Sequence, residues 1–241
     1  PGGGAGVQRW LKFVKYLPQY GWQPVIYCPE GGEMPVIDNS LEKDIPPEAI
    51  ILRRKIWEPY ELYKKFTGRS GEKIDTGFLS KQKSRGFTEK IAVWLRGNFF
   101  IPDARRFWIR PSIKFLEKYL EGNPVDAIVS TGPPHSMHLI ALGLKKKTGI
   151  PWLADFRDPW TNIDYYPDLM LTRIADKKHH RLEKEVLVGA DAVVCIGKTM
   201  AEEFEKIAGK KIEVITNGFD FEDLKAEVSK VTESLPGIRF S

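Results

Sequence analysis

The feature that most constrains the fold is a regular alternation of apolar runs and helical segments in the second half of the chain. Apolar runs without polar alternation occupy 126–130, 151–156, 191–196 and 212–216. Segments with helical periodicity separate them, at 136–148, 169–188 and 199–208. Strands that are apolar on both faces and separated by helices are typical of a parallel sheet covered on both sides. The sequence therefore predicts an α/β fold, a Rossmann-like doubly wound parallel sheet with helices on both faces.

The same alternation extends towards the start of the sequence. Apolar residues recur at helical spacing over 7–17, and strand-like runs follow at 24–28 and 50–52. A glycine run leads directly into this helix, so we expect a further strand before it, outside the sequence. We predict one Rossmann-like domain over 1–220 and a linker over 221–241.

Residues 53–125 interrupt the alternation with interleaved aromatic and basic side chains, and we predict a largely helical insert there. Between 53 and 118 the chain has 17 Lys and Arg against 7 Asp and Glu, whereas the whole chain has a net charge of +5. Such a segment suits a membrane surface, with cations on anionic headgroups and rings at the interface. The alternative is a set of ordinary helices that pack their rings into the core.

Other functional classes find little support in the composition. Cys28 and Cys195 lie far apart in apolar runs, so we expect buried reduced thiols in a cytoplasmic protein. The basic segment would place that protein peripherally on the inner face of the membrane. No Cys/His cluster has zinc spacing, and we predict neither a metal nor a cofactor. No recognised nucleic-acid motif accompanies the basic segment, so we predict no nucleic-acid partner.

Candidate site residues follow the predicted strands, because ligands bind beyond the carboxyl ends of the strands in such a sheet. Gly3 and Gly4 precede a helix whose N-terminus attracts anions, and glycine lets a ligand approach the backbone. Their spacing fits neither the dinucleotide fingerprint nor a P-loop, and a plain turn is the alternative. Thr131 and His135 follow another strand, with two prolines between them forming a rigid corner. A structural histidine is the alternative there.

The most distinctive junction is Asp-Phe-Arg-Asp-Pro-Trp, at 155–160. Arg157 can bind a phosphate or carboxylate through two hydrogen bonds, and the acids on either side can hold it in place. The alternative is a structural salt-bridge corner. Asn217 follows the last strand and opens an Asn-Gly pair, which by itself indicates only a turn.

Taken together, these junctions resemble those of bacterial family 4 glycosyltransferases. The motifs run from Gly3 to Asp220 and are, in order, Gly-Gly-x-Gly-Val-Gln-Arg, Thr-Gly-Pro-Pro-His-Ser, Asp-Phe-Arg-Asp-Pro-Trp-Thr, Ala-Asp-Ala-Val and Val-Ile-Thr-Asn-Gly-Phe-Asp. The resemblance implies a GT-B fold, in which two Rossmann-like domains face each other across a cleft. Residues 1–220 would be the acceptor-side domain, and 221–241 would lead to a nucleotide-sugar-binding domain.

The resemblance also implies a reaction, the metal-free and retaining transfer of a sugar from a nucleotide sugar to a surface-polysaccharide or lipid-linked acceptor. Arg157 would contact the acceptor or the transferred sugar, while Asp155 and Asp158 would orient it or bind hydroxyls, and these three form the predicted catalytic set. The predicted substrate-binding residues are Gly3, Gly4, Thr131, His135, Trp160 and Asn217. Gly3 and Gly4 would lie against the donor diphosphate or the acceptor, and His135 against the acceptor or its phosphate.

The donor would bind mainly to the second domain, so we expect this chain alone to be inactive. Family members have a Glu-x7-Glu motif in that domain, and Glu205 and Glu213, which share the spacing, straddle a helix and a strand. Two other readings stay open. A nucleotide-sugar epimerase would use the same architecture without an acceptor, and a non-catalytic module would bind a membrane surface.

Overall fold

The computed structural model describes residues 5–31, 38–57 and 87–221. The predicted site residues Gly3 and Gly4 lie outside these residues, as do 58–86 of the insert and 222–241 of the predicted linker. None of the helices in the described ranges is long and apolar enough to cross a membrane.

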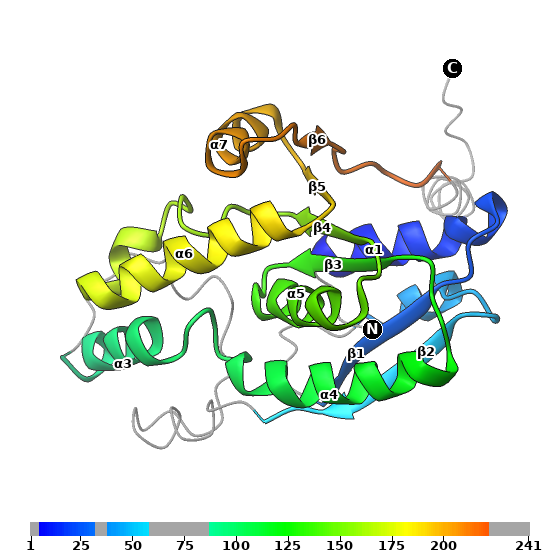
Figure 1. The fold of residues 1–241 in the computed structure, drawn as a ribbon, viewed down its shortest axis with the longest axis horizontal. Coiled ribbons are helices and arrows are strands. Elements are labelled where there is room, and N and C mark those ends of the chain that lie inside the picture. The colour runs from blue at the N-terminus through cyan, green and yellow to red at the C-terminus, as the bar shows by residue number, and fades with distance from the viewer. Residues whose placement is uncertain (1–4, 32–37, 58–86, 222–241) are drawn as a thin grey trace, which may run out of the picture.

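The strands are parallel and form two sheets within the described residues. One sheet has the order β3-β4-β5-β6, with bounds Ile128–Gly132, Trp152–Phe156, Ala192–Cys195 and Glu213–Val214. The other pairs β1 with β2, at Val25–Glu30 and Ile50–Lys55. Helices flank both sheets (Figure 1). The prediction of an α/β fold with parallel strands is confirmed, although we had expected a single sheet.

The helices connect and cover these strands. The longer ones are α1 (Ala5–Tyr16), α3 (Phe87–Phe99), α4 (Arg106–Gly122), α5 (Ser136–Thr148), α6 (Arg173–Gly189) and α7 (Lys198–Ala208). Short 3-10 helices are η1 (Leu17–Tyr20), η2 (Asn39–Asp44) and η4 (Tyr166–Leu169). The described part of the predicted insert forms α3 and α4, but residues 53–55 continue β2, so the strand extends past the predicted start of the insert.

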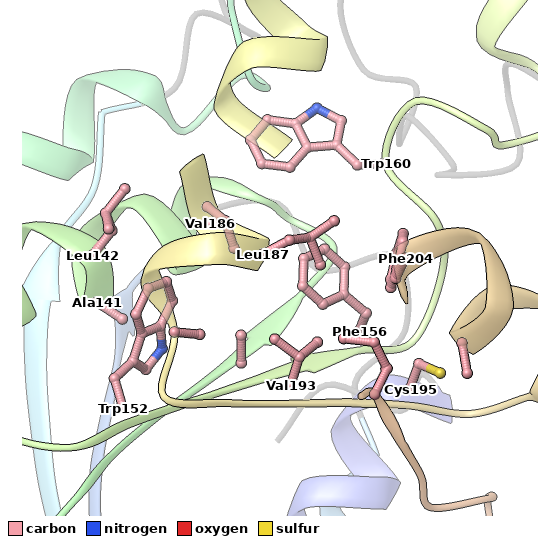
Figure 2. Packing of buried hydrophobic residues seen from close by; sticks show 14 residues of the cluster. Ala141, Leu142, Trp152, Phe156, Trp160, Val186, Leu187, Val193, Cys195 and Phe204 are labelled. Carbon is pink, nitrogen blue, oxygen red and sulfur yellow. The ribbon is translucent and has the colours of Figure 1, made fainter. Parts of the chain in front are cut away.

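The main core lies between β4, β5 and the helices α5, α6 and α7 (Figure 2). Phe156 is fully buried at the end of β4, and its ring meets that of Phe204 on α7 edge-on at a centroid distance of 4.8 Å. Figure 2 shows Trp160 on the α6 side of this ring. The chain that leaves β4 towards the candidate site is therefore anchored by large apolar groups on both sides of residue 157.

A second core joins the two sheets through α4. Trp108 is buried and stacks on Tyr27 of β1 at a centroid distance of 4.7 Å. The Tyr27 hydroxyl and the Ser112 hydroxyl of α4 are 2.8 Å apart and hydrogen-bonded. Because α4 also packs on α5, this helix of the insert is part of the scaffold.

The last strand, β6, is shorter than the sequence predicts. We expected a strand over 212–216, but the ladder extends only over Glu213–Val214. The carbonyls of Ile215 and Thr216 accept hydrogen bonds from the Arg9 guanidinium of α1, at 2.9 and 3.1 Å. The buried side chain of Arg9 therefore binds the backbone carbonyls that a longer β6 could have used for strand pairing.

Candidate functional site

The candidate site lies where β3, β4 and β6 end beside the first turns of α1. Thr131 pairs with Asp155 in the parallel register of β3 and β4, so their side chains occupy the same level of the sheet. Arg9 and Trp10 reach this level from α1. Residues that are distant in the sequence thus form one polar cluster at the carboxyl edge, where α/β proteins bind ligands.

Asp155 is the fully buried centre of this cluster. Its carboxylate accepts hydrogen bonds from the Trp10 indole N–H at 2.7 Å and the Thr131 hydroxyl at 2.8 Å. The Arg9 guanidinium forms an ion pair with it at 3.0 Å. A buried carboxylate requires such partners, because an unpaired charge in the interior is costly.

Arg9 joins Asp155 to the chain that leaves the sheet. Besides Asp155 and the two backbone carbonyls, its guanidinium donates to the Asn217 Oδ1 atom at 3.0 Å. The side chain of Arg9 is almost completely buried. The Asn-Gly pair therefore has more than a turn-forming role, because the Asn217 amide is part of the cluster.

Arg157 lies at the edge of the cluster and is only partly buried. Its Nε donates to the Thr131 hydroxyl at 3.1 Å, and its Nη2 donates to the Pro133 carbonyl. A Cβ atom on Gly6 would overlap the Arg157 Nη1 atom, so the guanidinium lies directly against the start of α1. Burial lowers the pKa of Arg157, and the nearby carboxylate of Asp158 counteracts this, so the group stays a cation.

His135 and Trp160 form a stacked pair behind this edge. Their ring centroids are 4.5 Å apart and the planes differ by 1°. Trp160 is buried, and its indole N–H donates to His179 Nδ1 at 3.0 Å, so it supports His135 from within. Burial places the pKa of His135 well below its usual value, and the imidazole is neutral.

A second histidine, His138, lies one turn further along α5 and is fully buried. Its Nδ1 is 2.8 Å from the Ser130 hydroxyl, whereas its Nε2 has no hydrogen-bond partner. A Cβ on Gly132 would lie 2.5 Å from that Nε2 and 3.3 Å from His135 Nδ1, which is also unpartnered. Burial lowers the pKa of His138 to about 3, so both rings are neutral beside the β3 end.

The start of α5 is fixed by a residue of the insert. The Asp103 carboxylate accepts from the Ser136 backbone N–H at 2.8 Å and from the Ser136 hydroxyl at 2.7 Å. His135, at the N-cap position, makes no capping bond with its own side chain. The first amide of α5 is therefore already occupied by a protein carboxylate, and the insert determines where His135 lies.

The structure brings most of the predicted site residues together. One hydrogen-bond network contains Thr131, Asp155, Arg157 and Asn217. The Thr131 hydroxyl joins Arg157 to Asp155, and Arg9 joins Asp155 to Asn217. Asp158 makes no hydrogen bond with any described residue. Roles in binding or catalysis stay predictions for all of these residues, and the burial of Asp155 and Trp160 favours supporting positions for both.

Sequence reasoning missed Arg9, Trp10, Asp103 and His138 as parts of the site. The signal for Arg9 was weak: it lies next to Trp10 at the apolar stripe of the predicted helix, but an arginine there can also extend to solvent. His138 follows His135 at a spacing of three, which places both on one helix face. Asp103 gave no comparable signal, because its partner is 33 residues away.

The site is suited to bind an anion, because the Arg157 guanidinium is a cation held in a fixed position. No group of three or more His, Cys, Asp or Glu side chains among the described residues could hold a metal ion. A hollow of about 250 Å³ lies elsewhere, between η4 and α6, and is lined by Tyr166, Pro167, Leu171, Arg173 and Asp176. We place the candidate site at the carboxyl edge, because the buried ion pair and the fixed guanidinium are there.

Comparison with known proteins identifies one match. The family model described as Glycosyltransferase Family 4 matches residues 76–223. No curated protein and no solved structure matches the chain. The matched range contains every predicted site residue except Gly3 and Gly4.

Proposed function

Because the chain belongs to glycosyltransferase family 4, we propose that it acts in transferring a sugar from a nucleotide sugar to a hydroxyl group, with retention of configuration. The acceptor is a surface-polysaccharide or lipid-linked glycan. This chain supplies the acceptor-side domain, and a second domain binds the nucleotide sugar.

The observation that carries the proposal is the position of Arg157. Its guanidinium is held by the Thr131 hydroxyl and the Pro133 carbonyl, and it lies against Gly6 at the beginning of α1. The partial positive charge of a helix N-terminus adds to that of the guanidinium. A fixed cation of this kind stabilises the negative charge that develops on a departing diphosphate, or holds an acceptor phosphate.

The neighbours of Arg157 have different roles in this proposal. Asp158 makes no hydrogen bond with the described residues, and its carboxylate binds acceptor hydroxyls. The neutral imidazole of His135 lines the acceptor position without competing for anions. Asp155 acts through Thr131, whose hydroxyl donates to Asp155 and accepts from Arg157.

The test is a transfer assay on the complete protein with a panel of nucleotide sugars, a membrane lipid extract as acceptor, and EDTA. Arg157→Ala removes the cation, and we expect transfer to fall by about 100-fold or more. Arg181→Ala is the matched control, because it removes an exposed arginine of α6 whose side chain is 67% exposed. We expect this variant to retain wild-type activity.

Several results would contradict the proposal. Arg157→Ala with near-normal transfer would remove Arg157 from the site. Release of an epimerised nucleotide sugar with no labelled acceptor would favour the epimerase reading. A product of inverted configuration would exclude the retaining mechanism.

A further inference from the structure

A second functional surface lies on elements other than those that carry Arg157. Here α3, α4 and the residues that follow β2 present four aromatic side chains to solvent, which we call the aromatic face: Trp57, Trp94, Phe99 and Phe107. Trp57 and Phe99 are each 56% exposed. Large rings at this exposure are unusual on a soluble surface, where extended apolar patches commonly mark an interaction site.

The rings of the aromatic face form two edge-on pairs that one arginine connects. Trp57 and Phe107 have centroids 5.1 Å apart, and Trp94 and Phe99 have centroids 5.8 Å apart. The Arg106 guanidinium lies 5.3 Å from the Phe107 ring centroid and donates to the Phe99 carbonyl. Arg106 thus contacts both pairs, through the ring of Phe107 and the backbone carbonyl of Phe99.

The apolar surface continues onto η4 and α6. Asn98 Nδ2 donates to the Met170 carbonyl at 3.3 Å, and Asn98 Oδ1 accepts from the Thr172 N–H at 2.7 Å. Met170 is 40% and Ile174 83% exposed. Figure 1 shows α3 and the first turns of α6 at the same end of the molecule. Helix α3 of the insert and the segment from η4 to α6 thus contribute to one surface.

Cationic side chains accompany these apolar groups on the same elements. They are Lys90, Arg96, Arg106, Arg110, Arg173 and Lys177. Arg106 and Arg110 are four residues apart on α4 and share one side of that helix. Acidic side chains lie nearby as well: the Asp103 carboxylate accepts from Ser136 of α5, and Asp176 of α6 accepts from the Tyr166 hydroxyl.

We propose that the aromatic face docks on the surface of an anionic lipid bilayer. Trp and Phe rings partition into the interfacial region, while Arg and Lys bind the phosphate headgroups above it. Cations surrounding exposed rings complement a surface that is anionic outside and apolar beneath. The proposal does not depend on sugar transfer, because docking requires neither donor nor acceptor.

The experiment is co-sedimentation of the complete protein with vesicles of phosphatidylglycerol and phosphatidylcholine, or of phosphatidylcholine alone, at low and moderate salt. The variant Phe99→Ser/Phe107→Ser lowers the apolar contribution, and Arg110→Glu/Arg173→Glu lowers the charge contribution without touching buried groups. We expect wild type to bind the anionic vesicles, and each double variant to lose at least about tenfold in partition coefficient.

The matched control removes exposed aromatic side chains that lie outside the aromatic face. Tyr20→Ser/Trp22→Ser removes two exposed aromatic side chains of the η1 region, which are 78% and 50% exposed, and it should leave binding unchanged. Circular dichroism verifies that each variant is folded. The proposal is overturned if wild type ignores anionic vesicles, binds phosphatidylcholine equally well, or loses as much binding through the control as through the aromatic face.

Discussion

Asp155 and Arg157 are two residues apart, yet their side chains face different environments. Asp155 is fully buried and has three partner side chains on two elements, α1 and β3, whereas Arg157 is partly buried at the rim. Residues two apart in a strand share a face, and both side chains contact the Thr131 hydroxyl, but β4 ends at Phe156, so Arg157 lies beyond the sheet at its rim. An acid two residues from a candidate ligand-binding arginine can therefore stabilise the fold instead of contacting the ligand.

The variant Asp155→Asn tests this distinction at the residue scale. An amide keeps the size of the side chain but leaves the buried Arg9 charge without its ion pair, so we expect unfolding free energy to fall by about 3 kcal/mol. Urea denaturation measures the change. Asp126→Asn is the control, because Asp126 is exposed before β3, and it should shift stability by no more than about 0.5 kcal/mol. A loss of similar size in both variants would contradict the buried role.

At the scale of elements, α1 holds the chain that leaves the last strand. Arg9 contacts 215–217, and one turn later Lys12 contacts Asp220 at 3.0 Å. Lys15 pairs with the same carboxylate at 3.0 Å. Because these contacts lie along one side of the helix, α1 fixes both the candidate site and the direction in which the chain continues towards the predicted linker.

The start of α5 provides the prediction at this scale. Asp103→Ala removes the carboxylate that binds the Ser136 amide and hydroxyl, so we expect a loss of about 1–2 kcal/mol in unfolding free energy. Asp103→Asn keeps an acceptor oxygen and should recover most of that stability. Thermal or urea unfolding of the pair provides the measurement. Equal stability of the alanine variant and wild type would mean that the insert does not hold α5.

At the scale of the whole molecule, the sequence predicted what local patterns determine. Helix α5 has the predicted bounds, because its apolar periodicity is clear and Gly149 ends it with a φ of 73°. The short β6 could not be predicted, because the competing donor, Arg9, is more than 200 residues away. The same holds for the Asp103 cap of α5. Local periodicity gives the elements, and long-range polar contacts decide where they end and which side chains meet.

The buried histidines give the whole fold a pH dependence. Burial lowers the pKa of His135, His138 and His179, so the folded state keeps them neutral while the unfolded chain binds protons below about pH 6.5. The contribution of these histidines to the unfolding free energy is fully present above that value. It is lost as pH falls, by up to about 1.4 kcal/mol per pH unit for each histidine. Burial raises the pKa of Glu183, which opposes this loss as pH falls through that raised pKa.

Urea denaturation between pH 8 and 5.5 tests this dependence through His138→Gln. The variant lacks one neutral buried imidazole, so its stability should fall less steeply with acidification, by up to about 1.4 kcal/mol per pH unit. Phe204→Leu is the control, because it weakens the core without removing a titratable group and should keep the wild-type slope. If the two variants have the same slope, His138 is not held neutral by burial, and a proton in the folded state must reach its unpartnered Nε2.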